Sequence, residues 1–270
     1  CYNKSNFQEE QPKRNMKLFF FDYDGTLYRP RSSGITPRVQ NALHALQEAG
    51  HKIILCTGRC YGNLPQETVD LCFDGYATAC GAATILDGKM AWDRRMDHAL
   101  LLEVLRLCER LELDGAAEGE KRVLFYRRPT HDPTVPEIHS YREYLDQFGD
   151  MPVNKLTLFR VPMPEELAHF FLDHNLSIIN NGDVYYEIIQ KGLHKGRAIQ
   201  DVADYFGIPV SDTYCFGDSM NDADMLRAAG HSLVVANAPA DIQVLGSEVI
   251  PSVYDDGVAQ WIERFLAQAQ

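Results

Sequence analysis

Short apolar runs that end in polar residues alternate with helical patterns in two distant parts of the chain. Continuous apolar runs of about four to eight residues are typical of strands buried on both faces of a sheet. Apolar residues spaced three or four positions apart predict helices between them. The elements predicted in this way are strands at 17–21, 53–56, 76–80, 213–216 and 232–235, and helices at 37–48, 66–72, 195–206, 220–229 and 258–267. This alternation indicates a parallel sheet with crossover helices.

The stretch between these two parts has a different pattern. Its predicted elements are helices at 98–111, 139–148 and 165–174 and strands at 122–127 and 155–161. Two more strands flank Asn181-Gly182, a dipeptide typical of a two-residue hairpin turn. We therefore expect an α/β protein with a doubly wound core formed by residues 16–82 and 188–270 and an inserted α+β domain of residues 83–187. The polar residues 1–15 would form an N-terminal extension outside the fold.

Acidic and small polar residues follow several of the predicted strands. Asp22 and Asp24 follow the first strand, Thr57 follows the second, and Asp218 follows the strand at 213–216. Because ligands of open α/β sheets bind beyond the carboxyl ends of the strands, we expect these side chains to converge. Asp222 would add another acid, and such a cluster of carboxylates disfavours ionisation unless a cation is present. Hard oxygen ligands in an incomplete protein cage favour Mg²⁺.

Charge and cysteine content narrow the class of protein. Lysine and arginine total 26 and aspartate and glutamate total 38, so the formal net charge is −12. This excess argues against nucleic acid or an anionic membrane as the main partner. No apolar run approaches the roughly 20 residues of a membrane span, and no signal-peptide pattern is present, so we expect a cytoplasmic protein. The seven cysteines lack the spacing of a disulfide framework or a zinc site, so we expect reduced thiols.

Four segments together resemble the motifs of a known family. In order, they are Phe21-Asp22-Tyr23-Asp24-Gly25-Thr26-Leu27, Cys56-Thr57-Gly58-Arg59, Lys195 within Lys191-Gly192-Leu193-His194-Lys195-Gly196, and Gly217-Asp218-Ser219-Met220-Asn221-Asp222. Their order and spacing are similar to those of the haloacid dehalogenase superfamily of phosphotransferases. The insertion resembles the large cap of its Cof-type, subclass IIB, phosphatases. The resemblance covers nearly all of residues 17–270 and implies a Rossmann-like core with an inserted cap domain.

The resemblance implies a role for each acidic residue. Asp22 would attack phosphorus and form an aspartyl-phosphate, which divides hydrolysis into two steps. Asp24 would protonate the leaving oxygen and later accept a proton from the attacking water. The Asp22 carboxylate, the Asp24 main-chain carbonyl and Asp218 would hold Mg²⁺. Asp222 would orient Lys195 or a metal-bound water without itself being a ligand.

The resemblance also implies which residues bind the substrate. The Thr57 hydroxyl, the Gly58 amide, Lys195 and Asn221 would hold the phosphate oxygens of a small phosphate ester. Arg59 suits either a substrate contact or a structural ion pair. Cap residues would distinguish the organic parts of substrates, and the basic candidates there are Arg127, Arg128 and Arg160.

The function that we expect is Mg²⁺-dependent dephosphorylation of small metabolites such as sugar phosphates. One alternative within the fold is a phosphomutase or a sugar-phosphate phosphatase of a related branch. Another alternative is a catalytically silent, phosphate-binding regulator. Both Asp22 and Asp24 are present, which argues against the silent regulator because a sensor needs no acid–base partner. The oligomeric state is left open.

Overall fold

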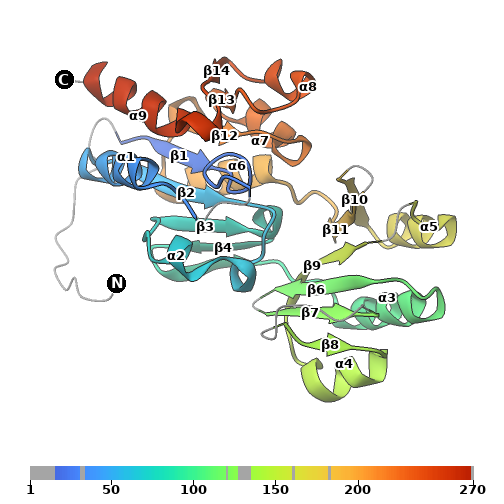
Figure 1. Cartoon of the computed structure of the whole chain (residues 1–270). Helices are drawn as coiled ribbons and strands as arrows, with labels where there is room; N and C mark the ends of the chain where they lie inside the picture. Colours follow the sequence, from blue (N-terminus) through green and yellow to red (C-terminus); the bar gives the residue numbers. More distant parts are fainter. Residues whose placement is uncertain are drawn as a thin grey trace.

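The computed structural model of the chain describes residues 16–30, 34–119, 121–126, 135–159, 162–181 and 184–268. Within these residues the paired strands form two sheets, a larger one of eight strands and a smaller one of six. In Figure 1 the larger sheet lies on the left and the smaller sheet on the right. The predicted α/β class with a mostly parallel main sheet is confirmed.

The larger sheet has the strand order β14-β13-β12-β1-β2-β3-β4-β5. Its strands are β1 (Leu18–Phe21), β2 (Lys52–Cys56), β3 (Gly75–Thr78), β4 (Ala83–Leu86), β5 (Lys89–Asp93), β12 (Thr213–Gly217), β13 (His231–Val235) and β14 (Glu248–Ile250). Strand β1 pairs in parallel with β2 on one side and with β12 on the other. The carboxyl ends of these three strands therefore meet at one edge of the sheet.

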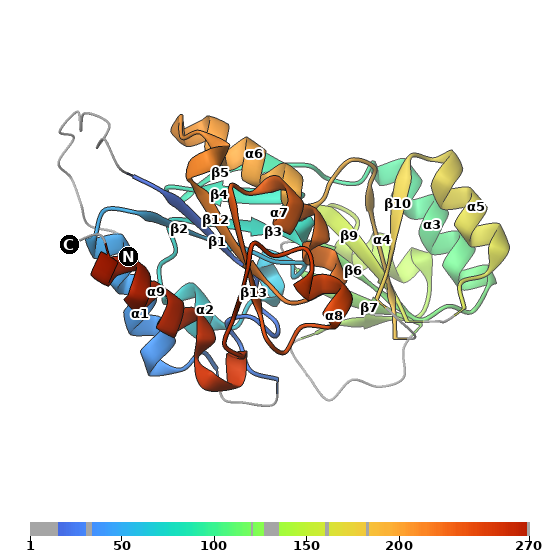
Figure 2. The same ribbon diagram turned by 90° about the horizontal axis from the view of Figure 1, so that it is seen from above.

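Helices cover both faces of the larger sheet, as Figure 2 shows from above. The helices around this sheet are α1 (Pro37–Glu48), α2 (Gln66–Val69), α6 (Lys195–Phe206), α7 (Ala223–Ala228), α8 (Ala240–Gln243) and α9 (Gly257–Gln268). Because side chains alternate along a strand, Phe19 and Phe21 pack with α1 and α9, whereas Leu18 and Phe20 pack with α6 and α7. All four side chains are fully buried, which explains the continuous apolar run.

The smaller sheet has the strand order β10-β11-β9-β6-β7-β8. Its strands are β6 (Gly115–Gly119), β7 (Arg122–Phe125), β8 (Glu137–Ile138), β9 (Val153–Leu158), β10 (Leu176–Asn180) and β11 (Tyr186–Gln190), and its helices are α3 (His98–Arg110), α4 (Tyr141–Phe148) and α5 (Glu165–Asp173). On β9, Leu156 and Leu158 pack in the core with the helices. Lys155 and Thr157 alternate with them and therefore occupy the opposite, polar face.

The sheet boundaries differ from the domain boundaries expected at residues 83 and 187. Strands β4 and β5 extend the larger sheet as an antiparallel hairpin, and β11 continues the smaller sheet to Gln190. The turn of the first hairpin is Asp87-Gly88, and both residues have positive φ, as a two-residue turn requires. The inserted domain itself stays a prediction, but its sheet begins after residue 93.

The two-residue turn expected at Asn181-Gly182 lies partly outside the described residues, because Gly182 is not among them. Asn180 pairs with Tyr186, so residues 181–185 connect β10 to β11. The backbone amide of Asn181 donates to the carbonyl of Tyr185, which extends the pairing of β10 and β11 beyond the strand ends.

Most described cysteines agree with the expectation of reduced thiols, with one exception. Five of them are free and buried, namely Cys56, Cys60, Cys80, Cys108 and Cys215. Cys72, which is less deeply buried, is disulfide-bonded, so the expectation is wrong for this residue. Among the described helices, none has both the length and the apolar character needed to cross a bilayer.

Candidate active site

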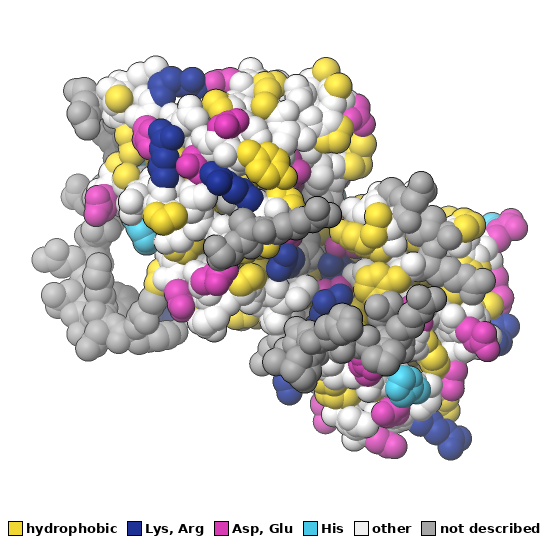
Figure 3. Space-filling model, in the orientation of Figure 1, with side chains coloured by type: hydrophobic (Ala, Val, Ile, Leu, Met, Phe, Trp, Pro, Cys, Tyr) yellow, Lys and Arg dark blue, Asp and Glu magenta, His cyan; other side chains and the backbone are white. Residues whose placement is uncertain are grey.

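A cleft of about 520 Å³ lies between the carboxyl edge of the larger sheet and the polar face of the smaller sheet. The larger sheet and its loops contribute Asp22, Asp24, Thr57, Gly58, Arg59 and Asn221. The smaller sheet and its loops contribute Glu118, Arg122, Lys155, Thr157, Tyr185 and Glu187. In Figure 3, lysine and arginine side chains gather where the two parts of the molecule meet. The cleft is thus lined by charged groups from both sheets.

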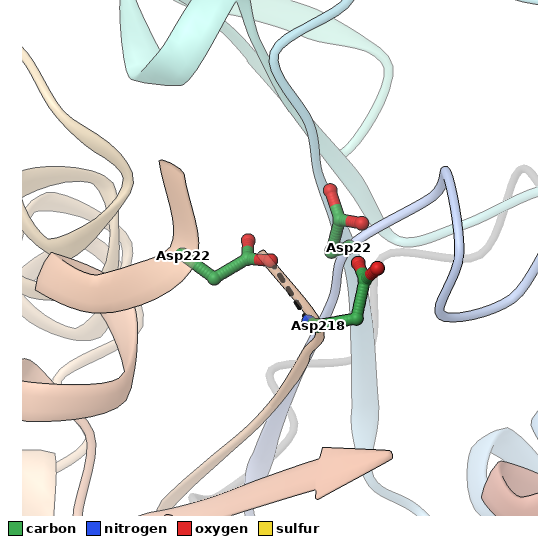
Figure 4. Close-up of side chains that lie close together, drawn as sticks. All are labelled: Asp22, Asp218 and Asp222. Atoms are coloured by element: carbon green, nitrogen blue, oxygen red, sulfur yellow. Dashed lines mark hydrogen bonds between the residues drawn. The ribbon is translucent and has the colours of Figure 1, made fainter. Parts of the chain in front are cut away.

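Three carboxylates converge at the end of β1, and their nearest oxygens lie within 4.8 Å of one another. Figure 4 shows Asp22 beside Asp218, with Asp222 approaching from the turn before α7. Burial and the negative charges of Asp222 and Asp218 raise the pKa of Asp22 well above its usual range, although the Lys195 ammonium opposes the shift. Burial and the charge of Asp222 also raise the pKa of Asp218 to about 7.

This donor set fits a hard divalent cation. Carboxylate oxygens are ligands of Mg²⁺, and a cation would relieve the repulsion that raises the two pKa values. Gly25 lets the Asp218 carboxylate approach the backbone, because a Cβ there would lie 2.3 Å from Asp218 Oδ2. Its φ of +87° also favours glycine.

Asp222 differs from the other two acids because both of its oxygens are occupied. Its Oδ1 accepts a hydrogen bond from Lys195 Nζ at 2.6 Å. Its Oδ2 accepts from the backbone amides of Asp218 and Ser219, each at 3.0 Å, and one of these bonds is drawn in Figure 4. Asp222 therefore holds the loop and the lysine in place through both of its carboxylate oxygens.

Lys195 is the first residue of α6 and is completely buried. Its Nζ donates to Asp22 Oδ1 at 2.5 Å, to Asp222 Oδ1 at 2.6 Å and to Asn221 Oδ1 at 3.0 Å. Burial alone would lower the pKa of Lys195, but the carboxylates of Asp22 and Asp222 outweigh it and hold the pKa well above its usual value. The ammonium is therefore charged and lies next to the expected nucleophile.

Asp24 carries an ion pair at the mouth of the cleft. Arg59 Nε and one terminal nitrogen each donate to an Asp24 oxygen at 2.7 Å, which makes the pair bidentate. The Arg59 guanidinium also lies over the Tyr23 ring, 4.8 Å from its centre. Of the two interpretations left open for Arg59, the ion pair is the one seen, and Arg59 lines the cleft as well.

Thr57 and Gly58 form the start of the loop after β2. The buried Thr57 hydroxyl accepts from the backbone amide of Arg59 at 3.1 Å. A Cβ on Gly58 would lie 3.4 Å from both Asn221 Nδ2 and Glu187 Oε1. The loop therefore lies close to groups from both sides of the cleft, and the predicted catalytic, phosphate-binding and metal-ligating residues lie in one region.

The side of the cleft formed by the smaller sheet, called the cap side after the domain that the sequence predicts, contains residues that the sequence motifs did not identify. Lys155 Nζ donates to Glu187 Oε1 at 2.6 Å and to the Gly58 carbonyl at 2.8 Å, and it lies 3.8 Å from Glu118 Oε1. Thr157 donates to Glu118 at 2.6 Å. Polar residues at alternate positions of an otherwise apolar strand were the available signal. The candidates Arg127, Arg128 and Arg160 lie outside the described residues.

The family model described as haloacid dehalogenase-like hydrolase matches residues 19–262. The chain belongs to this family. A relative in Bacillus subtilis strain 168, the 5-amino-6-(5-phospho-D-ribitylamino)uracil phosphatase YwtE, is 28% identical, with 93% of this chain and 99% of the relative covered. Pyridoxal phosphate phosphatase YbhA of Escherichia coli K12 is 25% identical, with 93% and 98% covered.

Solved structures agree with the fold of this hydrolase. The subclass IIB sugar phosphatase BT4131 matches with a TM-score of 0.76 and 24% identity, covering 93% of this chain and 99% of the other. BT1666 from Bacteroides thetaiotaomicron matches with a TM-score of 0.77 and 22% identity, covering 97% and 99%. The predicted family, the Rossmann-like fold class and the enzyme class of hydrolase are confirmed.

Proposed function

We propose that this phosphatase of the haloacid dehalogenase-like family uses Mg²⁺ and a phosphorylated Asp22 intermediate to hydrolyse phosphate monoesters of small metabolites. The observation that carries the proposal is the convergence of Asp22, Asp218 and Lys195 at the carboxyl edge of the larger sheet. The relatives whose names specify phosphate esters support the substrate class. The cytoplasmic location and the lack of a nucleic-acid partner stay predictions.

The nucleophile and its neighbours account for the first step. The Asp22 carboxylate attacks phosphorus, a bond forms between its oxygen and phosphorus, and the bond to the leaving oxygen breaks. Lys195, the Thr57 hydroxyl, the Gly58 amide and the Asn221 side chain hold the remaining phosphate oxygens as charge shifts onto them. Lys195 already touches Asp22, so it orients the nucleophile and the phosphate together.

Asp24 supplies and removes protons in this proposal. As an acid it protonates the leaving oxygen, and as a base it takes a proton from the water that hydrolyses the phosphorylated Asp22. Both oxygens of Asp24 are held by Arg59. Its carboxyl group must therefore leave at least one of these hydrogen bonds before it can donate a proton.

The metal would be held by the Asp22 and Asp218 carboxylates together with the main-chain carbonyl of Asp24. When bound, Mg²⁺ would offset the repulsion between the Asp22 carboxylate and the phosphate anion. The pKa values of Asp22 and Asp218, both raised by burial and neighbouring acids, support a cation between them. Asp222 would act through Lys195 and the loop amides.

A phosphate-release assay tests the proposal. Purified protein is incubated with a panel of phosphorylated metabolites and with p-nitrophenyl phosphate, in Mg²⁺ or in excess chelator. We expect continuous release only with Mg²⁺, and none from the Asp22→Asn variant, whose side chain keeps its size but loses the nucleophile. The exposed Asp241→Asn variant is the matched control. Equal turnover by Asp22→Asn would exclude the covalent route, and unchanged release in chelator would exclude the metal. Binding without release by the unaltered protein would favour the silent regulator.

A further inference from the structure

The two cations on the cap side of the cleft have different surroundings. Lys155 is buried between Glu187 and Glu118 and also binds the Gly58 carbonyl. Arg122 lines the same cleft, but within the described residues it makes no ion pair, and its buried Nε has no hydrogen-bond partner. A buried N–H without an acceptor is unfavourable, so such a group needs an explanation, and in a cleft a bound ligand provides one.

The position of Arg122 in the sheet makes this lack of a partner informative. Arg122 on β7 lies directly opposite Glu118 on β6, and opposite charges at such positions ordinarily attract. The Glu118 carboxylate instead accepts from Thr157 at 2.6 Å and lies 3.8 Å from Lys155 Nζ. The second acid of this face, Glu187, accepts hydrogen bonds from the side chains of Lys155 and Asn181. Both acids are therefore engaged elsewhere, and Arg122 is left without a counter-ion among them.

We propose that Arg122 binds a second anionic group, a carboxylate or a phosphate, on the organic part of the substrate. This inference rests on the proposed function, because it assumes that the scissile phosphate lies at Asp22. A guanidinium offers parallel N–H groups that match the two oxygens of a carboxylate or phosphate. The cleft of about 520 Å³ has room for an organic part beyond a phosphate alone. The preferred substrates are thus phosphate esters with a second negative charge.

Paired substrates that differ in one group test the inference. 3-Phosphoglycerate and glycerol 3-phosphate differ by a carboxylate in place of a hydroxymethyl group, and fructose 1,6-bisphosphate and fructose 6-phosphate differ by a phosphate. For at least one pair we expect a kcat/KM about 10- to 100-fold higher for the more anionic member, as a charged hydrogen bond allows. The pair that shows the preference identifies the second group as a carboxylate or a phosphate.

Variants separate recognition from structure. Arg122→Gln should remove the 10- to 100-fold preference and leave the kcat/KM for p-nitrophenyl phosphate within about twofold, because that substrate carries no second anion. Its melting temperature should be unchanged, since Arg122 has no partner to lose. The matched control is Arg110→Gln on the outer helix α3, where Arg110 is exposed and paired with Glu166. This control should keep the preference.

Two results of the kinetic assays would overturn the inference. One is the absence of any preference for the anionic member of either pair in the unaltered protein. The other is an equal loss on every substrate in Arg122→Gln, p-nitrophenyl phosphate included. If no substrate is hydrolysed at all, the proposed function fails, but calorimetry still tests Arg122. Binding of 3-phosphoglycerate or of fructose 1,6-bisphosphate should weaken about tenfold in Arg122→Gln, and equal dissociation constants would refute the inference.

Discussion

Lys195 and Lys155 lie on opposite sides of one cleft, and each is a buried ammonium near two carboxylates. Lys195 contacts both of its acids, at 2.5 Å and 2.6 Å. Lys155 contacts Glu187 at 2.6 Å, but Glu118 lies farther away, at 3.8 Å. For both lysines, burial opposes the charged form, and the neighbouring acids raise the pKa above its usual value.

The remaining neighbours of the two lysines explain their different roles. Beside Lys195 stands a third acid, Asp218, so three carboxylates share one ammonium and the site favours an added cation. Beside Lys155 stands the main-chain carbonyl of Gly58, which belongs to the loop expected to bind phosphate. The same charged arrangement would therefore serve the proposed chemistry on one side, and on the other it joins the smaller sheet to the loop that contains Gly58.

The largest loss of kcat/KM is expected from Asp24→Asn, on the larger-sheet side of the cleft. Acid–base help is worth about 10²–10⁴ in rate, so kcat/KM for alkyl phosphates should fall by that factor. Steady-state phosphate release measures it, with Asp241→Asn as the matched control. A loss of tenfold or less would remove Asp24 from the acid–base role.

The next largest effect is expected from Lys195→Met. This change removes the donor next to Asp22 and leaves its acids without their cation, so kcat/KM should fall by about 10²–10³ on every substrate. The exposed Lys191→Met variant, four residues earlier, controls for the loss of a positive charge. Unchanged kinetics would show that Lys195 takes no part in the reaction.

A smaller effect on catalysis is expected from Lys155→Met, with p-nitrophenyl phosphate turnover reduced by about tenfold or less. Its main effect should be on stability, because removing one partner of a buried ion pair costs about 3–5 kcal/mol. Urea unfolding measures this cost, and the control is the Lys121→Met variant, whose exposed lysine lies between β6 and β7. If Lys155→Met lost as much activity as Lys195→Met, the prediction that the two lysines have different roles would be wrong.

The smallest effect concerns pH and the metal-free protein. The pKa of Asp218 is raised to about 7 from a usual value of 3.8, so the folded state holds a proton that the unfolded state has released. The contribution of the Asp218 carboxyl to the free energy of unfolding is therefore full below about pH 4, and it is lost as the pH rises through about 7. Because Mg²⁺ needs the ionised acids, we expect it to raise the melting temperature by at least about 2 °C more at pH 7.5 than at pH 5.5. An equal gain at both pH values would contradict this.

Part of the larger-sheet side of the cleft could be predicted because several of its residues follow the ends of strands. Asp22, Thr57 and Asp218 come directly after apolar runs, and parallel pairing brings those ends together. Local structure still differed in places. The helix expected from residue 220 starts there as a 3₁₀ turn, Met220–Asp222, with a capping box between Ser219 and Asp222, and it continues as α7 only from Ala223.

The cap side could not be predicted in the same way. Glu118, Arg122, Lys155 and Glu187 stand on four different strands, and only the register of those strands brings them together. Strand β6 has the sequence Gly-Ala-Ala-Glu-Gly, which has low strand propensity and gave no local signal. The β4–β5 hairpin, by contrast, did carry a readable signal in Asp87-Gly88.

The parallel pairing of β1 with β12 has a consequence for the order of folding during synthesis. Lys17 and Asp212, ion-paired at the start of these two strands, are 195 positions apart in the sequence. At about 5–20 residues per second, a ribosome needs roughly 10–40 s to make the intervening chain. Until then β1 has an open edge, while the strands of the smaller sheet follow one another without interruption from β6 to β11. The nascent chain can therefore complete the smaller sheet well before Asp218 and Asp222 reach Asp22.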